Sequence, residues 1–440
     1  MSGPVALTPA DGFERPPLDL HGMVRTLFPF TRSLTGEGVR ATLREIARHI
    51  PLSMVEVPSG TPVLDWNVPK EWSIRSATIR SLDGRTLVDL NDSNLHVVSY
   101  SRPFHGVVSR EELARHVHTL PDQPDAIPYR TGYYADDWGF CLSHRAWMSM
   151  QDASYQIDID SELFDGSLTY GELFLPGDSG GEILINVHIC HPSLANDNLS
   201  GVAVATALAM RQMARERRRL GVRFLFVPAT IGAITWLAAN ENRLDAIRHG
   251  LVLTCVGDSG PFHYKQSRSG AAIDRAMAHV LRHSAAPFEL LPFTPYGYDE
   301  RQYCSPGFDL PVGCLMRGVH GTFPEYHTSL DNCDFVTSEA LEQSYALVAA
   351  ALDLLEHDQT YVRVDGRGEP QLGRRGLYRA IAGQKEAGGA TQMDLLWVLN
   401  LADGRHSLLD IAERSGAPFA RIRAAADIAR ESNLIQEHGS

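Results

Sequence analysis

Polar side chains that could bind a metal gather in the segment HICHPSLANDNLSG, which runs from His188 to Gly201. An apolar run over 183–189 predicts a buried strand before this turn, and an apolar-rich stretch over 202–213 predicts a helix after it. Open α/β sheets bind ligands at the carboxyl ends of strands, beside helix N-termini. We therefore expect His188 and Asp197 to converge, although they are nine residues apart.

A second polar cluster, EYHTSLDN, runs from Glu325 to Asn332 and includes His327 and Asp331. We expect His327 to supply a ligand from far along the chain and Asp331 to orient it from behind. Asp258 follows another predicted strand and is a further candidate. Zinc hydrolases use histidine nitrogens and carboxylate oxygens, with one position left for water. The predicted metal ligands are His188, Asp197, Asp258 and His327.

The elements that must position these residues alternate between strands and helices from about residue 132 to 353. Such alternation predicts an α/β fold with a mixed, mostly parallel sheet and helices on both faces. A further helix is expected within 18–50. Strands are predicted over 155–159, 182–189, 222–227, 251–256 and 312–316, and helices over about 200–217, 233–248, 271–285 and 338–356.

Changes in the pattern of apolar and turn residues divide the chain into several predicted domains. Between 66 and 130, short apolar runs alternate with turn residues, which predicts a small inserted β-rich domain. We expect the main α/β core over 1–65 and 131–360, a polar linker over 361–388 and a separate helical domain over 389–440.

The last 50 residues show three helical patterns, over 394–404, 407–416 and 417–435, followed by a short strand. This order is typical of a winged helix-turn-helix. Its third helix carries Arg421, Arg423 and Arg430, which would favour DNA binding, whereas a protein-interaction or dimerisation module is the alternative. Residues 386–440 hold eight acidic and five basic side chains, and phosphate binding needs the opposite balance. Nucleic acid is therefore not the expected partner.

The composition of the chain argues against several other classes of protein. The 440-residue chain has a formal net charge of −13, so it lacks the basic field of a nucleic-acid coat or membrane-surface protein. No stretch approaches the roughly 18 apolar residues needed to span a bilayer, and the N-terminus lacks a signal-peptide pattern. We expect a cytoplasmic protein. Its six cysteines are scattered without a CxxC pair, which favours reduced thiols.

The motifs resemble those of the zinc aminopeptidases of the aminopeptidase Y and bacterial leucyl aminopeptidase type. The resemblance rests on His188, the string Asp197-Asn198-Leu199-Ser200-Gly201, Asp258, and the string Tyr326-His327-Thr328. It covers about 132–355 and the helix within 18–50, and implies a zinc-exopeptidase-like fold in which the aspartate of the first string bridges two zincs. More closely, the chain resembles a bacterial group of aminopeptidase-like proteins. These combine this core with an inserted β-rich unit and a C-terminal winged helix, often near polysaccharide or natural-product genes.

The chain departs from those peptidases at one place. They carry Glu-Glu after the next strand, where the first glutamate is the general base and the second binds the second zinc. Here the strand 222–227 is followed by Pro228-Ala229-Thr230, and neither alanine nor threonine can act as a base at neutral pH. Cys190 also replaces an aspartate that orients the metal site. The second zinc would keep only Asp197 and His327, so one zinc is favoured over two.

Other residues could supply the missing base. Glu325 lies two residues before His327, and Glu300 lies in the polar run YGYDERQY. Each could equally be a surface carboxylate or an arginine partner, and His191 is a third option. A cysteine hydrolase is a weaker alternative, because Cys190 and His191 are neighbours that would point to opposite faces of a strand. His188 or His327 could still activate the thiol.

The sequence thus predicts a metal-dependent hydrolase that cleaves an amide or peptide bond of a small aminoacyl or peptide-like substrate. Acidic groups would hold the substrate's free amine, and zinc would lower the pKa of its bound water to about 7. A non-catalytic binding or scaffold protein with a degenerate peptidase cleft is the main alternative, favoured by the lost Glu-Glu pair. A regulator acting through the winged helix is another, and assembly into homo-oligomers stays open.

Overall fold

The computed structural model describes residues 15–377 and 390–438. Within them the chain forms two compact units. One unit comprises residues 15–271 and 287–346, and the other comprises residues 272–286, 347–377 and 390–438. The candidate site lies entirely in the first.

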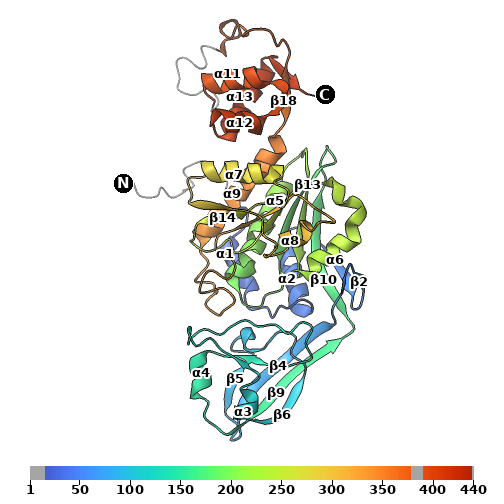
Figure 1. Cartoon of the computed structure of the whole chain (residues 1–440), viewed down its shortest axis with the longest axis vertical. Helices are drawn as coiled ribbons and strands as arrows, with labels where there is room; N and C mark the ends of the chain where they lie inside the picture. The colour runs from blue at the N-terminus through green and yellow to red at the C-terminus, as the bar shows by residue number, and fades with distance from the viewer. Residues whose placement is uncertain (1–14, 378–389, 439–440) are drawn as a thin grey trace, which may run out of the picture. The chain divides into compact units, whose positions relative to one another are not determined.

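The first unit is built on an eight-stranded sheet in the order β1-β10-β12-β11-β13-β16-β14-β15 (Figure 1). The central strands β12, β11, β13 and β16 run parallel. The pairs β1–β10, β10–β12 and β14–β16 are antiparallel, and β14 pairs with β15 in parallel. This confirms the predicted mixed, mostly parallel sheet. The strands are β1 Ser53–Pro58, β10 Ser167–Leu175, β11 Glu182–His188, β12 Gly221–Val227, β13 Ile247–Leu253, β14 Phe262–Lys265, β15 Phe288–Leu291 and β16 Val312–Met316.

The order in which the chain adds parallel strands to the sheet changes side at β11. From β11 it crosses through α5 to β12 on one side, then returns through α6 to β13 on the other side. Because parallel crossovers are right-handed, these opposite moves place α5 and α6 on opposite faces and open a crevice beyond the end of β11. Outside the inserted part, the helices of this unit are α1 Leu20–Leu27, α2 Glu37–Ala47, α5 Gly201–Met213, α6 Ile231–Asn240 and α8 Glu300–Tyr303, with a 3-10 turn at Glu241–Ala246; a 3-10 turn at Asn94–His96 lies in the inserted part.

The inserted part forms its own four-stranded sheet in the order β5-β4-β9-β6 (Figure 1). Its strand β9 contains residues 155–159, which the sequence analysis assigned to the main sheet. Burial alternates along β9, as it does in antiparallel strands with one covered face. The elements are β4 Glu71–Ser81, β5 Thr86–Asp89, β6 Phe104–Ser109 and β9 Ser154–Phe164, with the pairs β2 Pro62–Val63 and β3 Trp66–Asn67, and β7 Val117–His118 and β8 Phe140–Cys141, and the helices α3 Arg110–Leu113 and α4 His144–Ser149.

The second unit contains the predicted winged helix. Thr391 and Ser407 begin two of its helices, each in a capping box with an aspartate three residues on. The polar linker expected over 361–388 is partly structured, because β17 joins the winged-helix sheet; residues 378–389 lie outside the described ones. The elements are α7 Ala272–His283, β17 Thr360–Arg363, α11 Gln392–Leu401, β18 Asp403–Ser407, α12 Leu408–Ser415, α13 Phe419–Glu431 and β19 Ile435–Glu437, with a 3-10 turn at Gly373–Arg375. The boundary between the two units falls within the sequence of α9 Ser338–His357.

Two further expectations can be compared with the structure. None of the described helices combines the length and the apolar character that crossing a bilayer requires. All six cysteines are free thiols, and five of them are buried.

Candidate metal centre

The turn after β11 brings the first motif into the crevice at the end of this strand. β11 ends at His188, and the chain then passes through a π-helical turn, Ala195–Ser200, into α5. Every residue of that turn is buried. A buried turn with several polar side chains must satisfy each of them internally.

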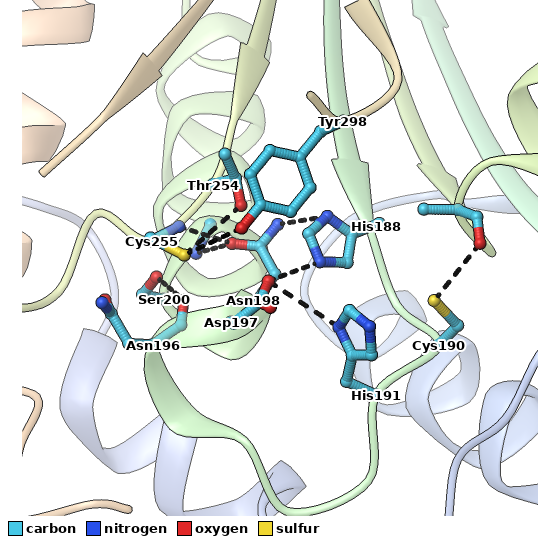
Figure 2. Close-up of polar contacts among 12 residues, drawn as sticks. His188, Cys190, His191, Asn196, Asp197, Asn198, Ser200, Thr254, Cys255 and Tyr298 are labelled. Carbon is cyan, nitrogen blue, oxygen red and sulfur yellow. Dashed lines mark hydrogen bonds and ion pairs between the residues drawn. The ribbon is translucent and has the colours of Figure 1, made fainter. Parts of the chain in front are cut away.

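Asp197 is the centre of the cluster. Its Oδ1 lies 2.8 Å from His188 Nε2, and its Oδ2 lies 3.0 Å from His327 Nε2. Its Oδ1 is also 3.7 Å from His191 Nδ1 (Figure 2). Burial alone would raise the pKa of this carboxyl, but the rings of His191 and His188 outweigh burial and hold the pKa well below its usual value. Asp197 is therefore an anion that faces three imidazoles.

His191 was expected only as an alternative base, yet it belongs to the cluster. Among the described residues, its buried Nδ1 has no hydrogen-bond partner. Burial lowers the pKa of His191 to about 3, so the ring is neutral at pH 7. Ligand atoms of His188, His191 and Asp197 all lie within 4.8 Å of one another. An unpaired neutral ring nitrogen beside another imidazole and a carboxylate is a donor set that fits zinc.

The neighbouring polar residues hold the turn that carries Asp197. Asp331 accepts the backbone N–H groups of Asn196 at 2.6 Å and Asp197 at 3.0 Å. Asn198 accepts the N–H of Cys255 and donates to the Leu253 carbonyl (Figure 2). Asp331 thus fixes the aspartate's backbone, in place of the expected role of orienting His327.

Aromatic rings fix the three histidines in place. Tyr298 stacks on His188 at 5.1 Å between ring centroids (Figure 2), and Tyr326 stacks on His327 at 4.0 Å. Tyr129 presents its ring edge-on to His191 at 5.1 Å and to His327 at 5.2 Å. Rings packed in this way have few alternative rotamers, so the nitrogens are preorganised.

Asp258 has a different role from the one that the sequence suggested. Its Oδ2 accepts the side-chain amide of Asn196 and the N–H of Gly318, and its Oδ1 accepts the N–H of Gly260. Both oxygens therefore join the ends of β13 and β16 to the metal-binding turn. The group of mutually close ligand atoms does not include Asp258.

The two predicted bases also differ in environment. Glu300 is completely buried and pairs with Lys265 Nζ at 2.7 Å, which argues against a role as a free base. Glu325 is half-buried in the turn before His327, and its carbonyl accepts the Thr328 N–H and hydroxyl. Asp299, which the sequence analysis overlooked, is fully buried beside Asn186, and burial raises its pKa to about 6.

The cysteine alternative loses support. Cys190 Sγ donates to the Ala229 carbonyl at 3.8 Å (Figure 2). Burial raises the pKa of the Cys190 thiol to about 12, so it stays protonated at neutral pH. A protonated, buried thiol is a poor nucleophile.

Family models cover nearly all of the described chain. One model, described as "Domain of unknown function (DUF4910)", matches residues 21–358. A second, described as a winged helix-turn-helix, matches residues 359–437.

A Clostridium acetobutylicum relative is similar along almost its whole length. It is 45% identical over 419 residues, which cover 95% of this chain and 96% of the relative. Its name assigns it provisionally to polysaccharide biosynthesis and gives it an aminopeptidase-like domain. A crystal structure from the same organism, described provisionally as a peptidase, has a TM-score of 0.90 and 44% identity, covering 95% of this chain and 96% of that one.

More distant structures share the fold of the core. A zinc aminopeptidase from Bacillus subtilis has a TM-score of 0.56 at 14% identity and covers 76% of this chain and 93% of its own. A peptidase M28 precursor from Shewanella amazonensis has a TM-score of 0.54 at 13% identity, covering 76% and 92%. The core therefore has an aminopeptidase-like fold, with a winged helix at its C-terminal side.

Proposed function

We propose that this chain, which belongs to the family described as "Domain of unknown function (DUF4910)", is a metal-dependent hydrolase of an amide or peptide bond. The observation that carries the proposal is the group of His188, His191 and Asp197, in which the buried Nδ1 of His191 has no hydrogen-bond partner among the described residues. The aminopeptidase-like fold adds support, because a zinc aminopeptidase from Bacillus subtilis shares this fold.

A single zinc ion fits the donors better than two. His188 Nε2, His191 Nδ1 and Asp197 Oδ1 would hold it, which leaves a fourth position open for water. On the other side, Asp197 Oδ2 faces only His327 Nε2, so a second ion would have two protein ligands. When bound, zinc polarises a carbonyl and lowers the pKa of water to about 7.

The chain's own residues would do the remaining work. Asp197 keeps its negative charge between the histidines, and Asp331 holds its backbone in place. We assign proton transfer to the carboxylate of Glu325, because it is only half-buried and lies in the same turn as His327. A proton taken up by its carboxylate could then pass to the leaving amine.

The substrate is proposed to be a small aminoacyl or peptide-like amide. The Clostridium acetobutylicum relative is named for polysaccharide biosynthesis, and we propose that this chain acts in a pathway of that class. The proposed metal ligands, His188, His191 and Asp197, would act on a single amide group, so a small substrate is sufficient.

The test compares Asp197→Asn with Asp258→Asn on a panel of aminoacyl amides, using the zinc-loaded full chain. The Asp197→Asn side chain would keep the shape but lose the charge that binds the metal. Hydrolysis should fall by more than about 100-fold, because losing a ligand should exceed the effect of losing an outer partner. Asp258→Asn should retain most activity. Equal rates for wild type and Asp197→Asn, with both folded by circular dichroism, would contradict the proposal.

A further inference from the structure

A cavity of about 180 Å³ lies beside the metal centre, within the first unit. Apolar and aromatic side chains form most of its lining: Leu34, Trp66, Tyr133, Tyr134, Ile231 and Ile234. Its remaining lining comes from Ala229 and Thr230, the two residues that replace the Glu-Glu pair. No charged side chain lines it among the described residues.

Two short paths connect the cavity with the metal ligands. The Tyr133 hydroxyl lies 2.8 Å from the Tyr129 hydroxyl, and the Tyr129 ring contacts His191. On the other path, the Ala229 carbonyl accepts Cys190 Sγ, and Cys190 directly precedes His191. The cavity is therefore one side chain away from His191 along each path.

The mouth of the cavity carries two exposed aromatic rings. Trp66 and Tyr134 are 48% and 60% exposed, and their ring centroids are 5.8 Å apart with the planes tilted by 49°. Such rings gain free energy by covering an apolar or aromatic surface. Large exposed aromatic side chains at a concave site are typical of ligand contacts.

We propose that this cavity is the specificity pocket of the enzyme and binds an uncharged aromatic or bulky aliphatic side chain carried by the substrate. The inference rests on the proposed function. A dry cavity of about 150 Å³ accepts a benzene ring, so 180 Å³ accommodates a phenyl group. A carboxylate or ammonium would be buried here without a counter-charge, which is strongly unfavourable. A sugar ring would leave its hydroxyls largely unpaired against the isoleucines.

Amino-acid hydroxamates test the pocket, because their head group binds zinc while the side chain varies. We expect the phenylalanine and leucine hydroxamates to bind the zinc-loaded full chain at least about tenfold more tightly than the alanine one, and the aspartate one to bind most weakly. Isothermal titration calorimetry gives the dissociation constants. Trp66→Ala and Ile234→Trp should remove the preference without weakening the alanine hydroxamate.

The control is Leu82→Ala, which removes another exposed apolar side chain, 65% exposed, from outside the cavity lining. It should leave all four affinities unchanged. Because Trp66 is half-exposed, its variant should fold even if Ile234→Trp does not. Equal affinities for the four compounds, or a preference that survives Trp66→Ala, would overturn the pocket while leaving the metal centre intact. Absence of binding by all four would overturn the proposed function and the pocket with it.

Discussion

At the scale of single residues, His191 changes the composition of the metal centre. His188, His191 and Asp197 each provide one ligand atom, and these three atoms lie within 4.8 Å of one another. Both oxygens of Asp258 instead accept hydrogen bonds from neutral N–H groups. A three-ligand site with an open position is the usual arrangement in catalytic zinc sites. The proposed centre thus keeps three donors for one ion although the chain lacks the Glu-Glu pair.

Ligand variants should separate these roles. His188→Ala and His191→Ala should each weaken zinc binding by more than about 100-fold, because loss of a ligand should exceed the effect of losing an outer partner. Competition with a chromophoric chelator measures the affinity. Asp258→Asn, the matched control, should bind zinc within a few-fold of wild type. Wild-type affinity in His191→Ala would show that His191 is not a ligand.

The buried pair of Lys265 and Glu300 should contribute to stability rather than to catalysis. Both side chains are almost inaccessible, and Lys265 Nζ also donates to the Tyr296 carbonyl. Glu300→Gln would leave a buried ammonium without its counter-charge and should lower the free energy of unfolding by about 3–5 kcal/mol. Urea unfolding measures this change.

The double variant Lys265→Met/Glu300→Leu is the control for that loss. It should recover most of the stability, because neither charge is then left alone. Glu300→Gln that keeps its stability but loses hydrolysis would instead identify Glu300 as the base.

Local motifs allowed part of this site to be predicted. His188 and Asp197 lie close in sequence, at a strand end and in the turn after it, so their convergence followed from the topology. His191 is predicted above only as an alternative base, because its position beside Asp197 depends on the turn that follows the end of β11 at His188. Nothing in the sequence indicates that Asp258 turns toward Asn196 or that Glu300 meets Lys265, since both contacts depend on tertiary packing.

At the scale of elements, the order of the parallel strands explains where the site lies. β11 lies between β12 and β13. The connection from β11 to β12 runs to one side of β11, and the connection from β12 to β13 crosses to the other side, so the crevice opens at His188. Apolar runs were sufficient to predict β11, β12 and β16. β13 spans 247–253 rather than the predicted 251–256, and its first two residues were predicted to end the preceding helix. The strand at 155–159 was assigned to the wrong sheet, because alternation identifies a strand without identifying its partners.

One contact between α7 and α13 should make the second unit sensitive to pH. The Phe419 N–H, at the start of α13, donates to His279 Nε2 at 3.0 Å. Burial, together with His283, lowers the pKa of His279 to about 4, while an unfolded histidine titrates near 6.5. Between these values the unfolded state binds more protons, so stability is fully present above about pH 6.5 and decreases as the pH falls toward 4.

Between pH 7 and pH 5 the titration of His279 should lower the free energy of unfolding of the second unit by about 2 kcal/mol. Hydrogen exchange of the α13 amides in the full chain, corrected for the intrinsic rate, measures it. His279→Gln should reduce the pH dependence, because its amide oxygen accepts the same N–H without titrating. His105→Gln, an exposed histidine of the inserted sheet, should not. Identical pH dependence in wild type and His279→Gln would refute the assignment.

At the scale of the whole molecule, charge opposes DNA binding. The chain carries a net charge of −13, and the arginines of α13 are paired with acidic side chains: Arg421 with Asp394, and Arg423 and Arg430 with Asp427. The winged helix is present, but its third helix does not present a free basic face.

A random DNA duplex should therefore bind only weakly, with a dissociation constant above about 100 μM even near 50 mM salt, at the weak end of non-specific binding. Fluorescence anisotropy of a labelled duplex measures the binding. Micromolar affinity that weakens with salt would contradict this expectation and favour a regulator.

We propose that this chain hydrolyses an amide with one bound zinc ion. The most direct measurement adds zinc stepwise to the metal-free full chain while following the hydrolysis of aminoacyl amides. The account predicts a rate that rises in proportion to added zinc and levels off at about one ion per chain, as expected for a site with three protein ligands. Zinc bound at that ratio with no amide hydrolysed, or hydrolysis that does not depend on zinc, would contradict it.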